Sequence, residues 1–305
     1  YHGVTFVDNE EAYAKDIVVV LRYPGDDKLR LMRPGACLIS MLHYPTRPIR
    51  VAFLRSLGIE AISLDSLKDD VGRRLVENLR AVGWNGVDIA FQVLRSIYPA
   101  PGLEAPNRLP VKVTVMGAGA VGMFAIQAAI RYGNQDYWQK MAHAGVTGVQ
   151  VTAVDYDLTN HPHIMQQIIK YTDILVDATQ RVDTSVPIIP NEWIGLMRPH
   201  AVLVDLSVDP YDTSTDPPSM KGIEGIPQGT LDQFIFTPAD PIYNTLPSFV
   251  HTEHRRHAVS CYSWPGIYPK DCMQVYGHQL LPILQTIIQM KGVQNLTPRD
   301  TFFER

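Results

Sequence analysis

Residues 111–122, which read VKVTVMGAGAVG, decide the fold. The apolar run Val111–Met116 predicts a buried strand, and Gly117, Gly119 and Gly122 follow it at the start of an alanine-rich helix. In such a strand–turn–helix, the first glycine allows a tight turn, the second lets the backbone approach a pyrophosphate, and the third lets helix and strand pack closely. The helix N-terminus adds N–H groups and the positive end of a dipole. The stretch therefore predicts a dinucleotide-binding turn, although a tight turn without a ligand has the same pattern.

Four further residues are assigned to the same nucleotide site. Ala120 and Val121 lie between the second and third glycines, and Ala178 and Thr179 directly follow another apolar run, Ile174–Asp177. Nucleotides bind at the carboxyl ends of the strands in open α/β sheets, which is where all four are expected.

An acidic residue at the end of the second strand is expected to bind the adenosine ribose. Val151–Val154 predicts that strand and Asp155 follows it, with Asp157 as the competing choice. Asp155 lies farther from the glycines than the usual ~20 residues, which we attribute to an insertion at Asn134–Gly148. Because a carboxylate repels a 2′-phosphate, NAD is predicted over NADP. A preference for NADP would instead point to Asp157 or to a basic residue such as Arg181.

Strands and helices alternate along most of the chain, which predicts an α/β fold with two Rossmann-like domains and parallel sheets. The expected strands are Ile17–Leu21, Ala36–Leu42, Ile59–Leu64, Val111–Met116, Gln150–Val154, Ile174–Asp177 and Ala201–Leu206. The expected helices are Arg50–Leu57, Gly122–Tyr132, Ile164–Tyr171, Asn191–Met197 and Met273–Met290.

A proline-rich stretch marks the expected domain boundary. Residues 70–97 have helical periodicity, as one helix or two, with Gly83 and Gly86 marking a break or a close packing point. Four prolines between residues 99 and 110 then exclude regular helix or central strand. We expect residues 1–106 to form a first domain joined by 271–305, and residues 107–270 to form the nucleotide domain.

The order of these motifs resembles that of the alanine dehydrogenase and pyridine nucleotide transhydrogenase family, to which saccharopine dehydrogenase is broadly related. Besides the glycine turn, the resemblance rests on Asp16–Pro24, Leu38–His43, Met197–Asp209 and Pro265–Lys270. Asp16–Pro24 is similar to the family's strand that ends in a substrate-binding lysine, and Leu38–His43 to its strand that ends in a catalytic histidine. Met197–Asp209 is similar to its late nucleotide-domain strand, and Pro265–Lys270 to its Met-Pro-Gly-x-x-Pro-Arg turn.

The resemblance implies an NAD-dependent oxidoreductase that interconverts an amino acid, imine or secondary amine and a 2-oxo acid, with a cleft between its domains and a homo-oligomeric assembly. His43 and Asp209 take the catalytic positions, and Arg22 takes the substrate-binding position. His43 ends an apolar strand, where an imidazole of near-neutral pKa can exchange a proton with substrate. Each residue also has a purely structural alternative: His43 as a histidine that caps a strand, Arg22 as a member of a surface ion pair, and Asp209 as a residue that caps a loop.

The chain also departs from the family pattern. Arg22 replaces a lysine, which retains a cation suited to bidentate carboxylate binding but removes any lysine chemistry. Ser263 and Trp264 stand where an Asn-Met pair is expected, and the segment with the family's N-terminal substrate-binding arginine has no counterpart. Two other functions therefore stay open: a non-catalytic nucleotide-binding regulatory protein, and hydride exchange of the transhydrogenase type.

Composition excludes several other classes. The 305 residues have a net charge of −4 and no cationic run longer than Arg255-Arg256, so nucleic acid is not an expected partner. No apolar run reaches the ~20 residues needed to cross a bilayer. The 3 cysteines lack CxxC spacing, which favours the reducing cytoplasm and disfavours a thiolate metal site. A metal on His251, His254 and His257 would need a helix there, and no metal is predicted.

Overall fold

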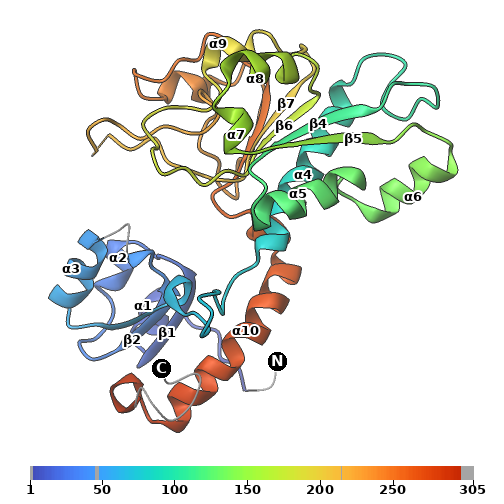
Figure 1. The fold of residues 1–305 in the computed structure, drawn as a ribbon. Helices are drawn as coiled ribbons and strands as arrows, with labels where there is room; N and C mark the ends of the chain where they lie inside the picture. Colours follow the sequence, from blue (N-terminus) through green and yellow to red (C-terminus); the bar gives the residue numbers. More distant parts are fainter. Residues whose placement is uncertain (1–2, 45–47, 214, 297–305) are drawn as a thin grey trace. The chain divides into compact units, whose positions relative to one another are not determined.

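The computed structural model describes residues 3–44, 48–213 and 215–296. The chain forms two compact units (Figure 1). Unit 1 comprises Tyr1–Glu77 and Met273–Arg305, and unit 2 comprises Asn78–Cys272.

Unit 1 is built on a three-stranded parallel sheet in the order β1-β2-β3. Its elements are α1 (Asn9–Tyr13), β1 (Ile17–Arg22), α2 (Asp26–Leu29), β2 (Cys37–Met41), α3 (Pro48–Ser56), β3 (Glu60–Ser63), a 3₁₀ turn at Leu64–Ser66 and most of α10 (Pro269–Gln289), followed by a 3₁₀ turn at Val293–Asn295. A small core of apolar side chains supports the sheet, with Leu29, Leu38 and Leu42 fully buried.

Unit 2 is built on a six-stranded sheet in the order β5-β4-β6-β7-β9-β8, parallel except for the edge strand β8. Its strands are β4 (Val111–Met116), β5 (Val149–Val154), β6 (Ile174–Asp177), β7 (Val202–Asp205), β8 (Ile235–Phe236) and β9 (His257–Ser260). Its helices are α4 (Leu79–Ile97), α5 (Ala120–Ile130), α6 (Gln135–His143), α7 (Tyr156–Thr159), α8 (Pro162–Ile169) and α9 (Asn191–Ile194), with 3₁₀ turns at Pro241–Thr245 and Trp264–Ile267.

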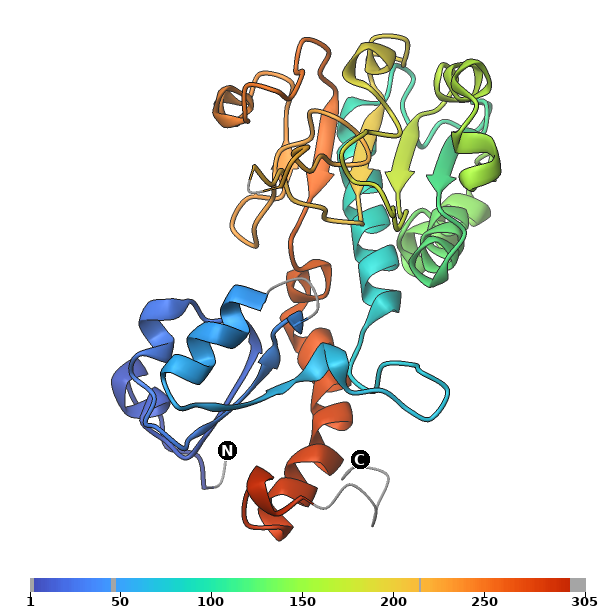
Figure 2. The same cartoon turned by 60° about the vertical axis from the view of Figure 1, so that its left-hand side comes forward.

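Helices cover both faces of the unit 2 sheet, as Figures 1 and 2 show. On one face, alternate residues such as Val113 and Val115 of β4 pack in a core with α4 and α5. On the other face, residues such as Met116 of β4 and Leu175 of β6 pack with α8 and α9. Strands buried on both faces read as continuous apolar runs, so the predicted α/β class with parallel, Rossmann-like sheets is confirmed.

Helix α4 belongs to unit 2, which differs from the expected boundary at residue 106. A Cβ at Gly83 would lie 2.7 Å from the Val121 carbonyl oxygen, and one at Gly86 would lie 2.3 Å from the Leu206 side chain. The two glycines therefore mark close packing of an unbroken α4 on α5 and β7, and the helix begins only at Leu79. Periodicity predicted this helix, but it does not specify which sheet the apolar face covers.

The predicted insertion after the first helix contains structure of its own. Most of Asn134–Gly148 is the amphipathic helix α6, capped by the Asn134 side chain and anchored by the buried Met141. The late strand β9 was not expected, because its four residues lie in a polar part of the sequence.

Candidate functional site

The glycine turn has the geometry that its sequence predicts. Gly117 has a φ of +91°, a left-handed backbone that side chains disfavour, and a Cβ there would lie 2.7 Å from the Ala178 carbonyl oxygen. A Cβ at Gly122 would lie only 1.8 Å from the carbonyl oxygen of Gly117. A Cβ at Gly119, by contrast, meets no atom within 4 Å. Gly119 therefore faces open space at the N-terminus of α5, as a backbone that receives a pyrophosphate must.

Asp155 lies directly beside this turn. It ends β5 and caps α7, and its Oδ2 accepts a hydrogen bond from the Ala118 N–H at 3.3 Å, while Oδ1 accepts one from the Tyr156 N–H at 2.9 Å. Its side chain is exposed at the carboxyl edge of the sheet. Asp157 lies two residues farther on, within α7, and is exposed. Of the two acidic candidates, Asp155 is the one bonded to the glycine turn.

The strand order reverses between β4 and β6, which is where open α/β sheets bind their ligands. Ala178 directly follows β6 and donates its N–H to the Met116 carbonyl at 2.9 Å. Thr179 folds back onto β6, since its N–H and hydroxyl donate to Asp177 Oδ1 at 3.0 and 2.6 Å. Both predicted residues thus line the carboxyl edge next to the glycine turn.

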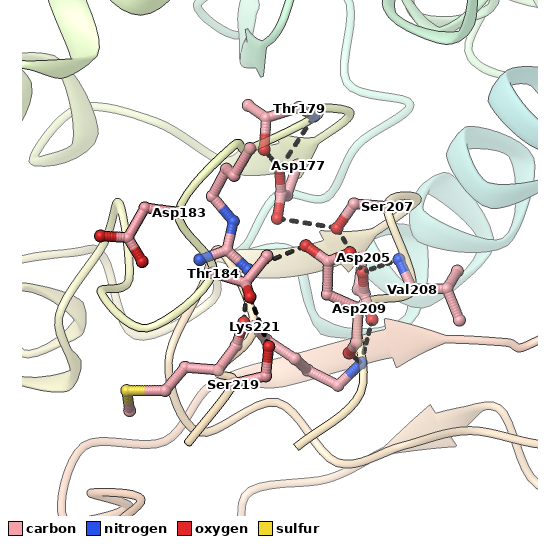
Figure 3. A network of polar contacts seen from close by, with 12 residues as sticks. Asp177, Thr179, Asp183, Thr184, Asp205, Ser207, Val208, Asp209, Ser219 and Lys221 are labelled. Carbon is pink, nitrogen blue, oxygen red and sulfur yellow. Dashed lines mark hydrogen bonds and ion pairs between the residues drawn. The ribbon is translucent and has the colours of Figure 1, made fainter. Parts of the chain in front are cut away.

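A polar network lies at the ends of β6 and β7 (Figure 3). Asp177 and Asp205 face each other in register, and both are 1% exposed. Lys221, also 1% exposed, donates to Asp205 Oδ2 at 2.6 Å, to the Asp209 carbonyl at 2.9 Å and to Gln228 Oε1 at 3.0 Å. All three ammonium protons therefore have an acceptor.

The turn between β7 and Asp209 is held in an unusual conformation. Val208 has a φ of +58°, a left-handed value that is rare for a β-branched residue. Its N–H donates to Asp205 Oδ1 at 2.8 Å. Strained backbone of this kind costs about 1–3 kcal/mol and is retained where neighbouring groups impose it. Here Asp205 and Lys221 hold the two ends of the turn.

Asp209, the predicted catalytic carboxylate of this unit, forms an ion pair. Its Oδ2 lies 2.8 Å from Nη2 of Arg181, which also donates to the carbonyl oxygens of Val186 and Met220. The Arg181 side chain is 7% exposed. Arg181 follows β6, whereas Asp155 follows β5 on the other side of β4, so Arg181 is not placed beside the adenosine end of the site.

Unit 1 brings its predicted residues to one sheet edge. Arg22 ends β1 opposite Met41, the last residue of β2, and His43 follows two residues later with a φ of +52°. Asp65, which was not predicted from the sequence, contacts both the backbone and the ring of His43. The carboxylate accepts hydrogen bonds from His43 N–H at 3.1 Å and from the Ser63 hydroxyl at 2.8 Å, and its Oδ2 lies 3.5 Å from His43 Nδ1.

Burial and the nearby charges together lower the pKa of His43. Burial lowers the pKa of His43; Asp65 raises it, and the positive charges of Arg74, Arg50 and Arg22 lower it further. Burial opposes ionisation of Asp65, but hydrogen bonds from Ser63 and His43 outweigh it and lower the Asp65 pKa. The edge therefore combines an imidazole of lowered pKa, an oriented carboxylate and three guanidinium groups, which suits binding of an anion beside a group that can exchange a proton.

The histidine-rich segment does not form a helical metal site. His257 begins β9, and no metal-ligating cluster occurs in residues 3–44, 48–213 and 215–296. Instead, His251 Nδ1 lies 2.8 Å from Glu224 Oε1 at the rim of a cavity of about 550 Å³. None of the predicted site residues lines that cavity. No helix within the described part of the chain is long and apolar enough to cross a membrane.

Comparisons with known proteins agree with this geometry. Residues 88–212 match the family model "Alanine dehydrogenase/PNT, C-terminal domain". The chain is 22% identical to the alanine dehydrogenase of Bacillus subtilis (strain 168) over 66% of its own length and 55% of the relative's. It is 19% identical to the NAD(P) transhydrogenase subunit alpha of Haemophilus influenzae, over 95% of its own length and 56% of the relative's.

The fold matches as well. A solved L-alanine dehydrogenase superposes with a TM-score of 0.66 at 17% identity, and the match covers 94% of this chain and 75% of that one. The chain spans just over half the length of the two curated relatives. Residues 88–212 thus match the C-terminal domain of the alanine dehydrogenase and pyridine nucleotide transhydrogenase family, and the chain has the fold of a solved L-alanine dehydrogenase.

Proposed function

We propose that the protein is an NAD-dependent oxidoreductase that transfers hydride between the nicotinamide and a small amino acid or its 2-oxo acid. The observation that carries the proposal is the open space at Gly119, at the N-terminus of α5 and beside the acidic Asp155. A dinucleotide needs these features: room for its pyrophosphate, a helix N-terminus and a carboxylate for its ribose. The bound nucleotide supplies or accepts the hydride.

Each nucleotide-site residue has a proposed role. The backbone of Gly117–Gly122, which includes Ala120 and Val121, binds the pyrophosphate, and Asp155 accepts hydrogen bonds from the adenosine ribose. Ala178 and Thr179 line the path of the nicotinamide half along the end of β6. The carboxylate of Asp155 favours NAD over NADP because it repels a 2′-phosphate.

The substrate site is proposed on unit 1. Arg22 binds the substrate carboxylate, and His43 gives a proton to the imine or ketone during reduction and takes it back during oxidation. The lowered pKa of His43 favours the unprotonated imidazole, which is the form that accepts a proton in the oxidative direction. Asp209 is proposed to orient the substrate nitrogen, for which it must exchange part of its contact with Arg181.

The same proposal covers the setting of the enzyme. The substrate is a small molecule, and the protein works in the cytoplasm as a homo-oligomer. Hydride exchange between two nucleotides is the second candidate, because the match to a transhydrogenase subunit alpha spans 95% of this chain.

The test is oxidation of NADH in the presence of ammonium and a panel of 2-oxo acids. Replacing Arg22 by Ala should mainly raise KM for the oxo acid, and His43→Ala should lower kcat by about 10²–10⁴. Arg33→Ala is the matched control, since Arg33 pairs only at the surface with Asp16. Turnover between two nucleotides without any oxo acid would favour the second candidate. Nucleotide binding without turnover of any kind would establish a regulatory protein instead.

A further inference from the structure

Two buried carboxylates meet at the ends of β6 and β7. Asp177 and Asp205 are paired in the parallel register, and each is 1% exposed. Taking one carboxylate out of water is already costly, and placing a second beside it adds repulsion. Such a pair is stable when one member is neutralised by a cation and the other carries a proton.

The position of Ser207 indicates where a proton lies. Its hydroxyl oxygen is 3.1 Å from Asp177 Oδ2 and 3.2 Å from Asp205 Oδ1. A serine hydroxyl has one hydrogen, so it donates to only one of the two. If both carboxylates were ionised, the contact that does not receive the serine hydrogen would bring the serine oxygen and a carboxylate oxygen together with no hydrogen between them. A proton on Asp177 turns both contacts into hydrogen bonds: Asp177 donates to Ser207, and Ser207 donates to Asp205 (Figure 3).

The surrounding charges assign that proton to Asp177 rather than Asp205. Asp205 receives the Lys221 ammonium at 2.6 Å and the Ser260 hydroxyl at 2.8 Å. Although burial opposes its ionisation, Lys221 lowers the pKa of Asp205. Among the residues that the structure describes, the Asp177 carboxylate is hydrogen-bonded to Thr179 and Ser207 and to no cation. Burial and the charge of Asp205 raise its pKa to about 6, with Thr179 and the more distant Arg181 opposing that rise.

The groups facing Asp177 come from every neighbouring element. Asp205 lies on β7, Arg181 and Thr179 follow β6, and Lys221 lies in the loop whose next residue, Gly222, packs against the Asp177 carboxylate. Counting Asp177, Asp205 and Asp209 against Arg181 and Lys221, the fully ionised cluster carries one excess negative charge.

The cluster lies on the nicotinamide side of the proposed nucleotide site. The adenosine half is directed toward β5 by Asp155, and the pyrophosphate crosses the glycine turn after β4. The other half of the dinucleotide therefore runs toward β6 and β7, on the far side of the switch point. This step rests on the proposed function. The oxidised nicotinamide ring carries a positive charge and the reduced ring is neutral.

We propose that at mildly acidic pH Asp177 carries a proton in the nucleotide-free protein and releases it to solvent when the oxidised nicotinamide binds, so that Asp177 sets the preference between the two redox forms of the cofactor in that pH range. The positive ring supplies the charge that the ionised cluster lacks. The reduced ring supplies none, so the proton stays on Asp177. No covalent step is involved: one proton passes from the Asp177 carboxyl to buffer.

Calorimetric titration tests the proposal without measuring catalysis. NAD⁺, NADH and ADP-ribose are titrated at pH 5, 6 and 7, each in two buffers of different ionisation enthalpy. NAD⁺ should release a fraction of a proton at pH 5 and bind about three- to tenfold more tightly at pH 7. NADH and ADP-ribose share the pyrophosphate and adenosine but lack the positive ring, so their proton release at pH 5 should be smaller.

Asp177→Asn keeps the shape of the protonated side chain and cannot ionise, so it should abolish the extra proton release with NAD⁺. Asp136→Asn is the control, because Asp136 is exposed in the first turn of α6, outside the cluster. Equal proton release with NAD⁺ and NADH overturns the proposal, as does unchanged release in a folded Asp177→Asn variant. If that variant does not fold, the buffer comparison on the wild type decides. Failure of all three ligands to bind refutes the proposed function itself, and this inference with it.

Discussion

The carboxylate of Asp65 binds His43 at two points, since Oδ1 accepts the His43 backbone N–H at 3.1 Å and Oδ2 lies 3.5 Å from the Nδ1 atom of the ring. With a side chain only 5% exposed, Asp65 orients an imidazole that is itself half exposed. A carboxylate on one ring nitrogen fixes the tautomer and the orientation of the imidazole.

Replacing Asp65 by Asn should therefore lower the pKa of His43 further. Asp65 is the group that opposes the effect of burial and of the nearby arginines, and the substitution removes its charge. Titration of the His43 ring by NMR measures this. Asp69→Asn is the control, because Asp69 bonds to Arg73 and is not among the groups that shift His43. An unchanged His43 titration in Asp65→Asn would contradict the assignment.

The same substitution has a predictable pH dependence of stability. In the folded state the pKa of Asp65 lies below its unfolded value of about 3.9. The stability that ionised Asp65 contributes is therefore fully present above the unfolded pKa and is lost as the pH falls through the lower, folded pKa. Asp65→Asn should be less stable than wild type at pH 7, and the difference should shrink below about pH 4. Urea unfolding across this range provides the measurement.

Gly119→Val should abolish nucleotide binding while the protein still folds. A Cβ at Gly119 meets no protein atom within 4 Å, so the valine should be accommodated by the fold while occupying the space proposed for the pyrophosphate. Gly148→Val is a matched control, because a Cβ there also meets nothing and Gly148 lies outside the site. NADH fluorescence titration compares the two, and retained affinity in Gly119→Val would refute the site.

Asp155→Ala should weaken NAD binding and improve the relative affinity for NADP, because the substitution removes the repulsion of a 2′-phosphate. Asp157→Ala should leave both affinities close to those of wild type, since Asp157 lies farther along, in α7. The opposite ranking of the two variants would transfer the ribose-binding role to Asp157.

Lys221→Met should destabilise unit 2 by about 3–5 kcal/mol, because it leaves Asp205 charged, buried and without its cation. The double variant Asp205→Asn/Lys221→Met should recover part of that loss. Lys15→Met removes a surface pair with Glu11 and should cost less than about 1 kcal/mol. Denaturant unfolding of the three variants tests the order.

The sequence predicts those parts of the site in which the functional residue directly follows its strand. Gly117 and Asp155 do so, and His43 lies two residues after its strand; an apolar run ending in a polar residue is visible without the fold. Lys221 and Ser260 were not predicted, because they reach Asp205 from 16 and 55 residues away: Lys221 lies in a loop with no periodicity, and Ser260 ends β9, a strand that was not expected. Asp65 was missed for a related reason: it follows β3, and only the packing of β3 on β2 brings it beneath His43.

The domain boundary shows the same limitation at a larger scale. The amphipathic pattern of a helix predicts that its apolar face packs against another element, but it does not say which one. For α4 only the structure shows that Gly83 and Gly86 allow it to approach α5 and β7. The proline-rich segment after residue 98 is a loop within unit 2, and the chain passes from unit 1 to unit 2 earlier, between Glu77 and Asn78.

Unit 1 has a consequence for the order of folding during synthesis. Its N-terminal part ends at Glu77, whose N–H and carbonyl bond to the amide of Gln279 on α10 at 3.1 and 2.9 Å. The ribosome makes these partners 202 residues apart, with the whole of unit 2 in between. At about 5–20 residues per second, that interval is roughly 10–40 s. During that time the small sheet β1-β2-β3 lacks its last helix, so the unit made first is completed last, and a chaperone that shields exposed apolar surface would act on it during this interval.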